Sequence, residues 1–255
     1  MSWQSEKGRV ERRLYEFLGL HGTGLCVIYF NRAASAMGAV MRYLWSNWAI
    51  DNVKIERPTF HAAERIAKQF GLVEEDSDKL LYIPVALGGE VILWPGSTEY
   101  LLYDCCQTCY PNMFKGVEFK YQTQFAVLSF QENKPYGSPS GGGALVCRGE
   151  LREYFNKVYL PGGFYFNPRA GQCAETSDKL ACCNGCEIQK TMTRFLMERE
   201  RLMSIGLQPF NGRISWDPMN RFTHMYVYNH DGLDLKDLQG YTPYAEDKLL
   251  RKELR

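Results

Sequence analysis

Residues 80–103 read LLYIPVALGGEVILWPGSTEYLLY, and the fold assignment depends on the change of pattern in this stretch. Two glycines between apolar runs tolerate positive φ, and Pro-Gly favours a turn, so both dipeptides predict reversals of the chain. The stretch therefore predicts a small antiparallel β-meander. The three expected strands are Leu80 to Leu87, Val91 to Trp94 and Tyr100 to Tyr103. The two turns between them are Gly88-Gly89 and Pro95-Gly96.

The segments before this stretch have helical spacing. Residues 6–18 alternate apolar and charged positions with a period near 3.6, which predicts an amphipathic helix. Residues 25–48 carry more apolar surface than one stripe needs, so they predict a long core or interface helix with more than one neighbour. A third helix is expected between Pro58 and Gly71, residue types that suit a helix start and end.

The segments after this stretch complete an α+β assignment. Alternation in 117–130 predicts a further strand pair, and 135–143 is rich enough in Gly, Pro and Ser to predict a loop. The predicted fold has N-terminal helices, a small antiparallel β-meander, a later pair of longer helices, and a C-terminal strand and tail region. Residues 1–255 are expected to form one main body. The later helices are expected at 144–159 and 177–205, and the C-terminal strand at 222–228. Sub-regions are expected at 1–134, 144–206 and 207–255.

The composition excludes several classes of protein. The chain has 255 residues, 45% of them hydrophobic, which is enough to bury a sizeable core. Its 30 basic and 29 acidic residues give a net charge of +1, so no overall field favours nucleic acid or an anionic membrane. The first 19 residues lack the apolar core of a signal peptide, and Asn31, Arg32 and Arg42 interrupt the most apolar stretch. Neither secretion nor a membrane span is expected.

Nine cysteines without an export signal predict reduced thiols and not a disulfide framework. Two Cys-Cys-x-x-Cys hooks, at 105–109 and 182–186, could supply four thiolates to a tetrahedral zinc. The hooks are 73 residues apart, much more than the about 12–20 of compact zinc knuckles. Free buried thiols are therefore the competing interpretation. The candidate metal ligands are Cys106, Cys109, Cys183 and Cys186.

No recognisable catalytic motif appears. Cys26 with His21, and Ser140 in the glycine-rich loop, are candidate nucleophiles, but the loop sequence Gly-Ser-Pro-Ser-Gly is not a nucleophile elbow. Neither candidate has a convincing base and orienting group, so the favoured interpretation is a core thiol and a loop serine. Residues 141–143 are three glycines without a following Lys-Ser or Lys-Thr, so they predict a flexible loop and not a phosphate cradle. The sequence therefore favours a protein that is not an enzyme.

Aromatic residues, a proline and glycines follow a characteristic order over residues 27–130. They are Tyr43, Leu44, Trp45, Trp48, Pro58, Phe60, Phe70, Gly71, Tyr82, Gly88, Gly89 and Tyr100. This order resembles the portal, or upper-collar, protein of small short-tailed bacteriophages with protein-primed genomes. That family has an aromatic helix, a proline, a short helix ending in Phe-Gly, and a β-meander with glycines at its turns. The chain is short for this family, and the cysteine hooks are not a feature of it.

The resemblance implies a structural virion protein. Its expected function is that of a portal or connector subunit in a homo-oligomeric ring, usually of twelve copies, through which DNA is packaged and ejected. The expected partners are capsid and tail proteins and double-stranded DNA in a channel, with no membrane. The expected location is the virion, after synthesis in the host cytoplasm. The alternative is an intracellular binding protein held together by a structural zinc, its only cofactor, with nucleic acid as the candidate ligand.

Overall fold

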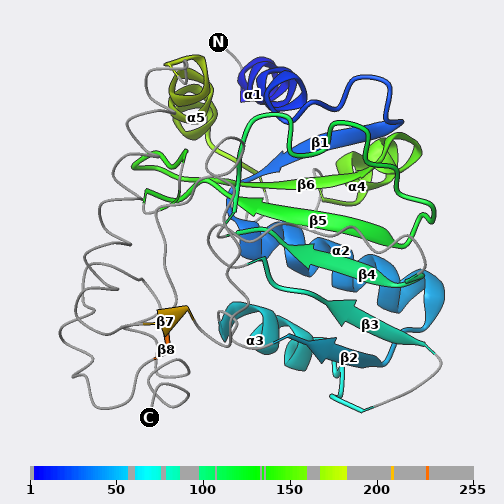
Figure 1. Cartoon of the computed structure of the whole chain (residues 1–255). Coiled ribbons are helices and arrows are strands. Elements are labelled where there is room, and N and C mark those ends of the chain that lie inside the picture. The colour runs from blue at the N-terminus through cyan, green and yellow to red at the C-terminus, as the bar shows by residue number, and fades with distance from the viewer. Residues whose placement is uncertain are drawn as a thin grey trace.

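The structure is a computed structural model whose main feature is a six-stranded sheet in the order β1-β6-β5-β4-β3-β2 (Figure 1). Strands β2, β3, β4 and β5 are mutually parallel, and β6 is antiparallel to both β5 and β1. The predicted mixture of helices and sheet is confirmed. The structure describes residues 3–56, 61–75, 79–86, 98–106, 108–132, 134, 136–159, 167–182, 208–209 and 228–229.

The elements of this body follow one another along the chain. A two-stranded sheet, β7 with β8, comprises residues 208–209 and 228–229. No described helix is long and apolar enough to cross a membrane. The strands are β1 (Leu25–Phe30), β2 (Asn52–Ile55), β3 (Leu80–Ile83), β4 (Leu101–Asp104), β5 (Gln124–Ser129) and β6 (Gly143–Arg148), and the helices are α1 (Trp3–Phe17), α2 (Ala33–Trp48), α3 (His61–Gln69), η1 (Gly149–Leu151), α4 (Arg152–Tyr159) and α5 (Ala170–Cys182).

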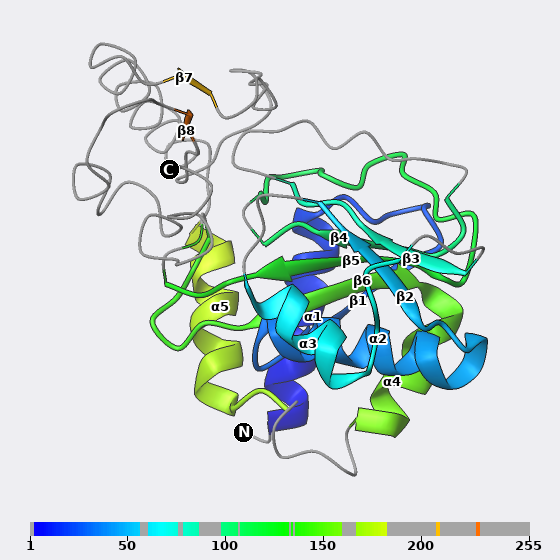
Figure 2. The same ribbon diagram turned by 90° about the horizontal axis from the view of Figure 1, so that it is seen from below.

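The sheet separates two hydrophobic cores. Alternate residues of β1 point to opposite faces, so Ile28 joins one core and Val27 the other. The first core packs the sheet against α2, α3 and α4, and α2 runs behind the strands in Figure 1. The second core packs it against α1 and α5. Figure 2 shows the same arrangement from below. Because both faces are covered, the middle strands β4 and β5 are buried at every position.

The predicted antiparallel meander is wrong. β3 and β4 are parallel, with Tyr82 opposite Leu101, and β4 is also parallel to β5. Parallel neighbours need a crossover connection, which a two-residue turn cannot provide. The middle run of the expected meander, Val91 to Trp94, lies outside the described residues, as do both turn dipeptides.

The long helix predicted over 25–48 is in fact strand β1 followed by helix α2, which starts at Ala33. The helix predicted at 144–159 likewise begins as strand β6 and becomes helical only from Gly149. Short continuous apolar runs have no periodicity that separates a buried strand from a buried helix, which explains both errors. The predictions of an N-terminal helix and of a helix ending near Gly71 are confirmed by α1 and α3.

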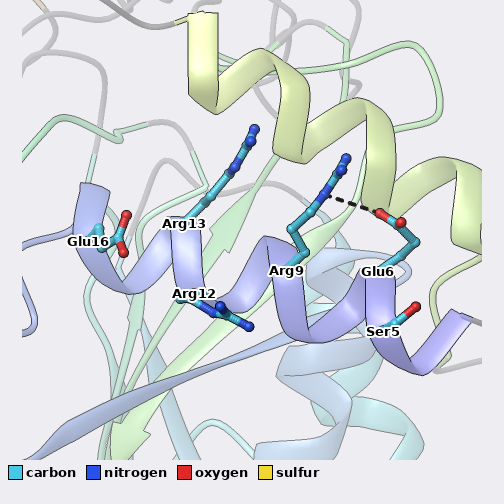
Figure 3. A pocket seen from close by; sticks show the side chains of 6 residues that line it. All are labelled: Ser5, Glu6, Arg9, Arg12, Arg13 and Glu16. Carbon is cyan, nitrogen blue, oxygen red and sulfur yellow. Dashed lines mark ion pairs between the residues drawn. The ribbon is translucent and has the colours of Figure 1, made fainter.

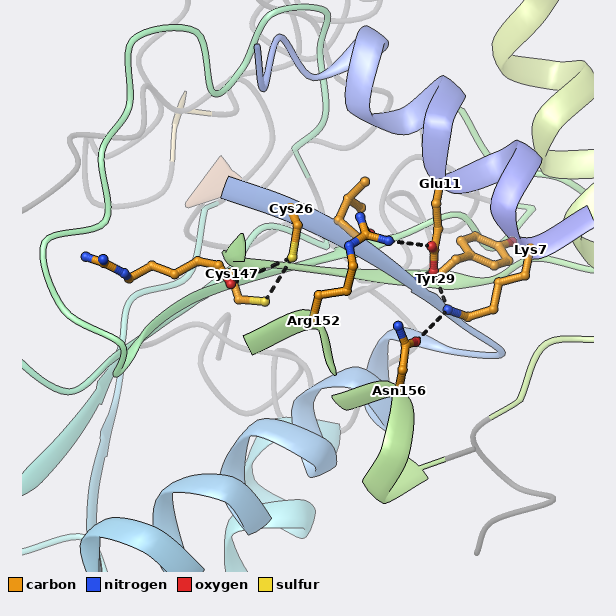
Figure 4. Close-up of polar contacts among 9 residues, drawn as sticks. Lys7, Glu11, Cys26, Tyr29, Cys147, Arg152 and Asn156 are labelled. Carbon is orange, nitrogen blue, oxygen red and sulfur yellow. Dashed lines mark hydrogen bonds and ion pairs between the residues drawn. The ribbon is translucent and has the colours of Figure 1, made fainter. Parts of the chain in front are cut away.

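An ion pair covers the exposed edge of the sheet at β1 (Figure 4). The outer N–H of Tyr29 donates to Glu11 Oε1 at 2.9 Å, and Arg152 Nη2 donates to the carbonyl of Val27 at 3.1 Å. Glu11 Oε2 and Arg152 Nη1 are 3.1 Å apart, and the Lys7 ammonium also binds Glu11. Two side chains thus take the backbone hydrogen bonds that another strand would take, which protects the edge from pairing with other chains.

Candidate active site

The carboxyl ends of five strands, β1 to β5, lie at one edge of the sheet. β1 and β5 are both antiparallel to β6, so they run in the same direction, and β2, β3 and β4 run parallel to β5. In Figure 1 the arrowheads of β3, β4 and β5 point the same way. In open α/β sheets, ligands bind in the crevice outside the carboxyl ends of the strands. Polar residues at this edge are therefore the first candidates for a functional site.

Asp104 is the last residue of β4 and is only 3% exposed. Its N–H donates to the carbonyl of Pro84 at 2.9 Å, and its own carbonyl accepts the N–H of Ala86 at 2.9 Å. Its carboxylate accepts the N–H of Cys106 at 3.0 Å. A buried carboxylate is costly without compensating charge or hydrogen bonds, so this rigidly held group is suited to a cationic partner.

Lys134 lies on the loop 130–142, which joins β5, the strand next to β4, to β6. The side chain is half-buried, and burial lowers the pKa of its ammonium below the usual value. Cys106 and Asp104 act in the opposite direction and raise this pKa, so both lie within electrostatic reach of the amine. A lysine with a lowered pKa has more neutral amine near physiological pH, and the neutral amine is the nucleophilic and basic form.

The loop that carries Lys134 is closed by its own backbone. Phe130 N–H donates to the carbonyl of Gly142 at 2.8 Å, and Ser138 N–H donates to the carbonyl of Phe130 at 3.0 Å. Within this closed loop, the N–H of Lys134 donates to the carbonyl of Gln131, and the carbonyl of Lys134 accepts the N–H of Gly137 at 2.9 Å. These hydrogen bonds join the described residues of this segment into turns, one of which includes the backbone of Lys134.

Gly143 ends this loop in tight contact with the start of α2. A Cβ added there would lie 2.2 Å from the backbone nitrogen of Ala33 and 2.4 Å from its Cα, closer than any real contact. We expect Gly143→Ala to lower the free energy of unfolding by about 1–3 kcal/mol, because the backbone must shift. Urea denaturation measures this. Gly171→Ala is the control, since a Cβ there meets nothing within 4 Å and alanine favours a helix. Equal stability of the two variants would contradict the contact.

The cysteines predicted as metal ligands are only partly placed. Cys106 and Cys109 follow β4, whereas Cys183 and Cys186 lie outside the described residues, so the four-thiolate set stays untested. Burial raises the pKa of the Cys106 thiol well above its usual range, and Asp104 raises it further. Among the described residues, no three His, Cys, Asp or Glu side chains form a cluster that could hold a metal ion.

The candidate nucleophiles have other partners. Cys26 lies opposite Cys147 on β6 with 3.6 Å between the two Sγ atoms, and this thiol contact lowers the pKa of Cys26. His21 packs edge-on against the ring of Tyr15, with centroids 4.9 Å apart. Ser140 donates its hydroxyl to Glu175 at 2.9 Å. The structure thus supports the interpretation as core thiol and loop serine.

Sequence reasoning missed both Asp104 and Lys134. Each follows an apolar run at once or within a few residues, which is the signal that could have identified them. The antiparallel interpretation gave no reason for the ends of β4 and β5 to lie at the same edge of the sheet, so this signal was not used. Only the parallel pairing of β4 with β5 brings the two residues together.

Comparisons with known proteins agree in fold. No protein-family model matches the sequence, and no curated protein is significantly similar to it. The structure is similar to a DegT/DnrJ/EryC1/StrS aminotransferase from Brucella abortus, with a TM-score of 0.65, 17% identity, and coverage of 92% of this chain and 73% of that one. A putative sugar aminotransferase from Streptococcus pneumoniae gives a TM-score of 0.63, 14% identity, and coverage of 91% and 72%.

A third similar structure comes from Bacillus subtilis and was solved with bound cofactor PMP. It has a TM-score of 0.64, 15% identity, and coverage of 95% of this chain and 67% of that one. The Streptococcus protein was solved in a PLP form and a PMP form as well as without cofactor. At these identities the likeness establishes a shared fold.

This likeness overturns the interpretation as a bacteriophage portal. The fold is shared with aminotransferases, so the expected non-enzymatic virion ring, its capsid, tail and DNA partners, and its location in a virion are wrong. The alternative of a zinc-binding protein finds no support in these structures. The expectation of no cofactor beyond a structural zinc is overturned, because similar structures carry PLP or PMP. The resemblance was misleading because aromatic residues and glycines occur in a similar order in unrelated folds.

Proposed function

We propose that this chain is a pyridoxal-phosphate-dependent enzyme that transfers amino groups, with Lys134 and Asp104 at its active site. The observation that carries the proposal is the pairing of a half-buried lysine and a buried carboxylate at the carboxyl edge of the sheet. The fold shared with aminotransferases supports the same reaction class. Fold alone does not determine function, so the proposal rests on these two residues.

The residues present fit the cofactor. Pyridoxal phosphate needs a lysine amine for its aldehyde and an acidic or basic partner for its ring nitrogen, and Lys134 and Asp104 supply these groups. Its phosphate needs an anion site. Helix α2 starts at the same edge, has no acidic residue in its first turn, and is preceded by Arg32, which makes no side-chain capping bond. A helix start of this kind favours an anion.

The cofactor, when bound, supplies an electron-withdrawing ring that eases bond breaking at the carbon bearing the amino group. Lys134 Nζ would hold the cofactor and move a proton to and from that carbon, which requires the neutral amine that burial favours. Asp104 would hold the positive charge of the ring nitrogen. The buried setting of Asp104 strengthens that electrostatic interaction, because little water screens it.

Covalent labelling tests the proposal. The purified chain is mixed with pyridoxal phosphate, reduced with borohydride, digested and mapped by mass spectrometry. We expect one pyridoxyl group on Lys134, because burial lowers the pKa of this amine and so favours its neutral, nucleophilic form. Lys134→Arg should abolish the labelling. The matched control is Lys120→Arg, which changes an exposed lysine and should leave the labelling of Lys134 intact.

Two outcomes count against the proposal. One is labelling spread over surface lysines to the same extent in the wild type and in Lys134→Arg. The other is saturable labelling at a lysine other than Lys134. Circular dichroism of each variant must match the wild type, so that a loss of labelling is not a loss of folding.

A further inference from the structure

Helix α5 contacts the loop that carries Lys134 through polar side chains. Glu175 accepts the N–H and the hydroxyl of Ser140, at 3.0 and 2.9 Å. Gln172 Nε2 donates to the carbonyl of Ser140 at 3.0 Å, to that of Gly141, and to that of Asn31 at 2.7 Å, just before α2. One amide group therefore joins α5, the loop and the start of α2.

Thr176 adds a second, fully buried connection. Its hydroxyl lies 3.2 Å from the hydroxyl of Ser138 in the loop and 2.6 Å from that of Tyr29 in β1. The exposed fractions of the three residues are 0% for Thr176, 3% for Ser138 and 1% for Tyr29. A buried hydroxyl costs free energy unless it is hydrogen-bonded, so the hydroxyls of Ser138 and Tyr29 both depend on that of Thr176.

Ser138 transmits this connection to Lys134. Its backbone N–H closes the loop on Phe130, and the preceding Gly137 donates to the carbonyl of Lys134. A rotation at Ser138 would therefore move the turn in which Lys134 lies. Tyr29 fills the space beside Gly142 at the end of the loop, because a Cβ on Gly142 would lie 2.0 Å from the hydroxyl of Tyr29. The loop is held between α5 and the sheet.

We propose that Thr176, Gln172 and Glu175 are positioning residues that hold the loop 130–142 in the shape that keeps Lys134 within reach of Asp104. This inference rests on the proposed function, since it assigns these residues to the same site. Residues 172 and 176 are one helical turn apart, and 175 is their neighbour, so α5 presents all three on one face. These three residues contact the loop at Ser138, Ser140 and Gly141, so their role is one of position.

Helix α5 has a separate attachment, which makes the proposal testable. Cys173 and Leu180 pack into the second core. On its other side, Arg9 of α1 pairs with Asp178 at 3.1 Å, and Arg13 donates to the carbonyl of Ser177. Figure 3 shows Arg9 and Arg13 reaching from α1 towards α5, beside the hollow that residues of α1 line. Loss of the polar contacts to the loop should therefore leave the helix docked.

The test measures the reactivity of Lys134 without cofactor. The chain is labelled with a small amine-reactive reagent across a pH series, and mass spectrometry quantifies the modification of Lys134. The proteins compared are the wild type and the variants Thr176→Val, Glu175→Ala and Asp178→Asn. Valine keeps the shape of threonine and removes its hydroxyl. Glu175 is exposed, so its variant should fold even if Thr176→Val does not. Asp178→Asn is the control on the same helix.

We expect the labelling profiles of Thr176→Val and Glu175→Ala to shift to higher pH. A loosened loop admits water to Lys134, which removes the effect of burial and leaves the Asp104 carboxylate to raise its pKa. A shift of one unit is about a tenfold loss of labelling at pH values below the pKa. Thr176→Val should shift more, because its contacts are buried, and Asp178→Asn should match the wild type.

The proposal is overturned if the profile of Lys134 is unchanged in Glu175→Ala and in any folded Thr176→Val, or if Asp178→Asn shifts it as much. This result is separable from the fate of the proposed function, because the labelling uses no cofactor. If pyridoxal phosphate fails to attach to Lys134 but the profile shifts, the amino-transfer proposal fails while the positioning role of α5 stands.

Discussion

Asp104→Asn is expected to slow amino transfer by a factor of about 10²–10³, the usual cost of removing one buried electrostatic group from an active site. Asparagine keeps the shape of aspartate and can still accept the N–H of Cys106, so the end of β4 should stay folded. Only the negative charge opposite the ring nitrogen is lost. The measurement is the single-turnover rate of the cofactor-loaded enzyme with a panel of amino-acid donors.

Asp51→Asn is the matched control for this prediction. Asp51 is an exposed carboxylate that precedes β2, at the opposite end of the strands, so its loss should leave the rate unchanged. An Asp104→Asn enzyme as fast as the wild type would exclude a role for this carboxylate. A second readout is the affinity for pyridoxal phosphate, which should weaken in Asp104→Asn alone.

Glu11→Ala is expected to lower the free energy of unfolding by about 3–5 kcal/mol, the range for breaking a buried ion pair by removing one partner. Glu11 accepts hydrogen bonds from Tyr29 N–H, Lys7 and Arg152 at the edge of β1. The alanine variant leaves the nearly buried Lys7 without its carboxylate. Since whole proteins are stable by about 5–15 kcal/mol, the change is large. Urea denaturation measures it.

Glu16→Ala provides the control, because Glu16 is an exposed carboxylate near the end of the same helix, and its loss should change stability by less than about 0.5 kcal/mol. A double-mutant cycle with Arg152→Met separates the ion pair from the rest of the network. If Glu11→Ala proves as stable as Glu16→Ala, the edge of β1 does not depend on this carboxylate.

The sequence was informative where periodicity is unambiguous. The helices near residues 6–18 and 60–70 alternate polar and apolar positions, and α1 and α3 lie there. It was misleading where every position is apolar. Residues 25–30 and 143–148 are buried on both faces of a covered sheet, so they lack the alternation that marks a strand.

The candidate site was beyond the reach of the sequence for a related reason. Asp104 and Lys134 are 30 positions apart, and neither lies in a motif that local spacing can identify. Their approach depends on β4 and β5 being parallel, which is set by crossover connections and by helices packing on both faces. The contacts from Gln172 and Thr176 are more distant still along the chain.

By itself, therefore, the sequence determined the mixture of helices and strands, the near-neutral charge and the boundaries of the most amphipathic helices, because these depend on composition and on neighbours a few residues away. Tertiary structure alone decided strand direction, and with it the edge at which Asp104 and Lys134 meet. The physical reason is that backbone pairing between distant segments is selected by the burial of both sheet faces, which no local pattern of side chains records.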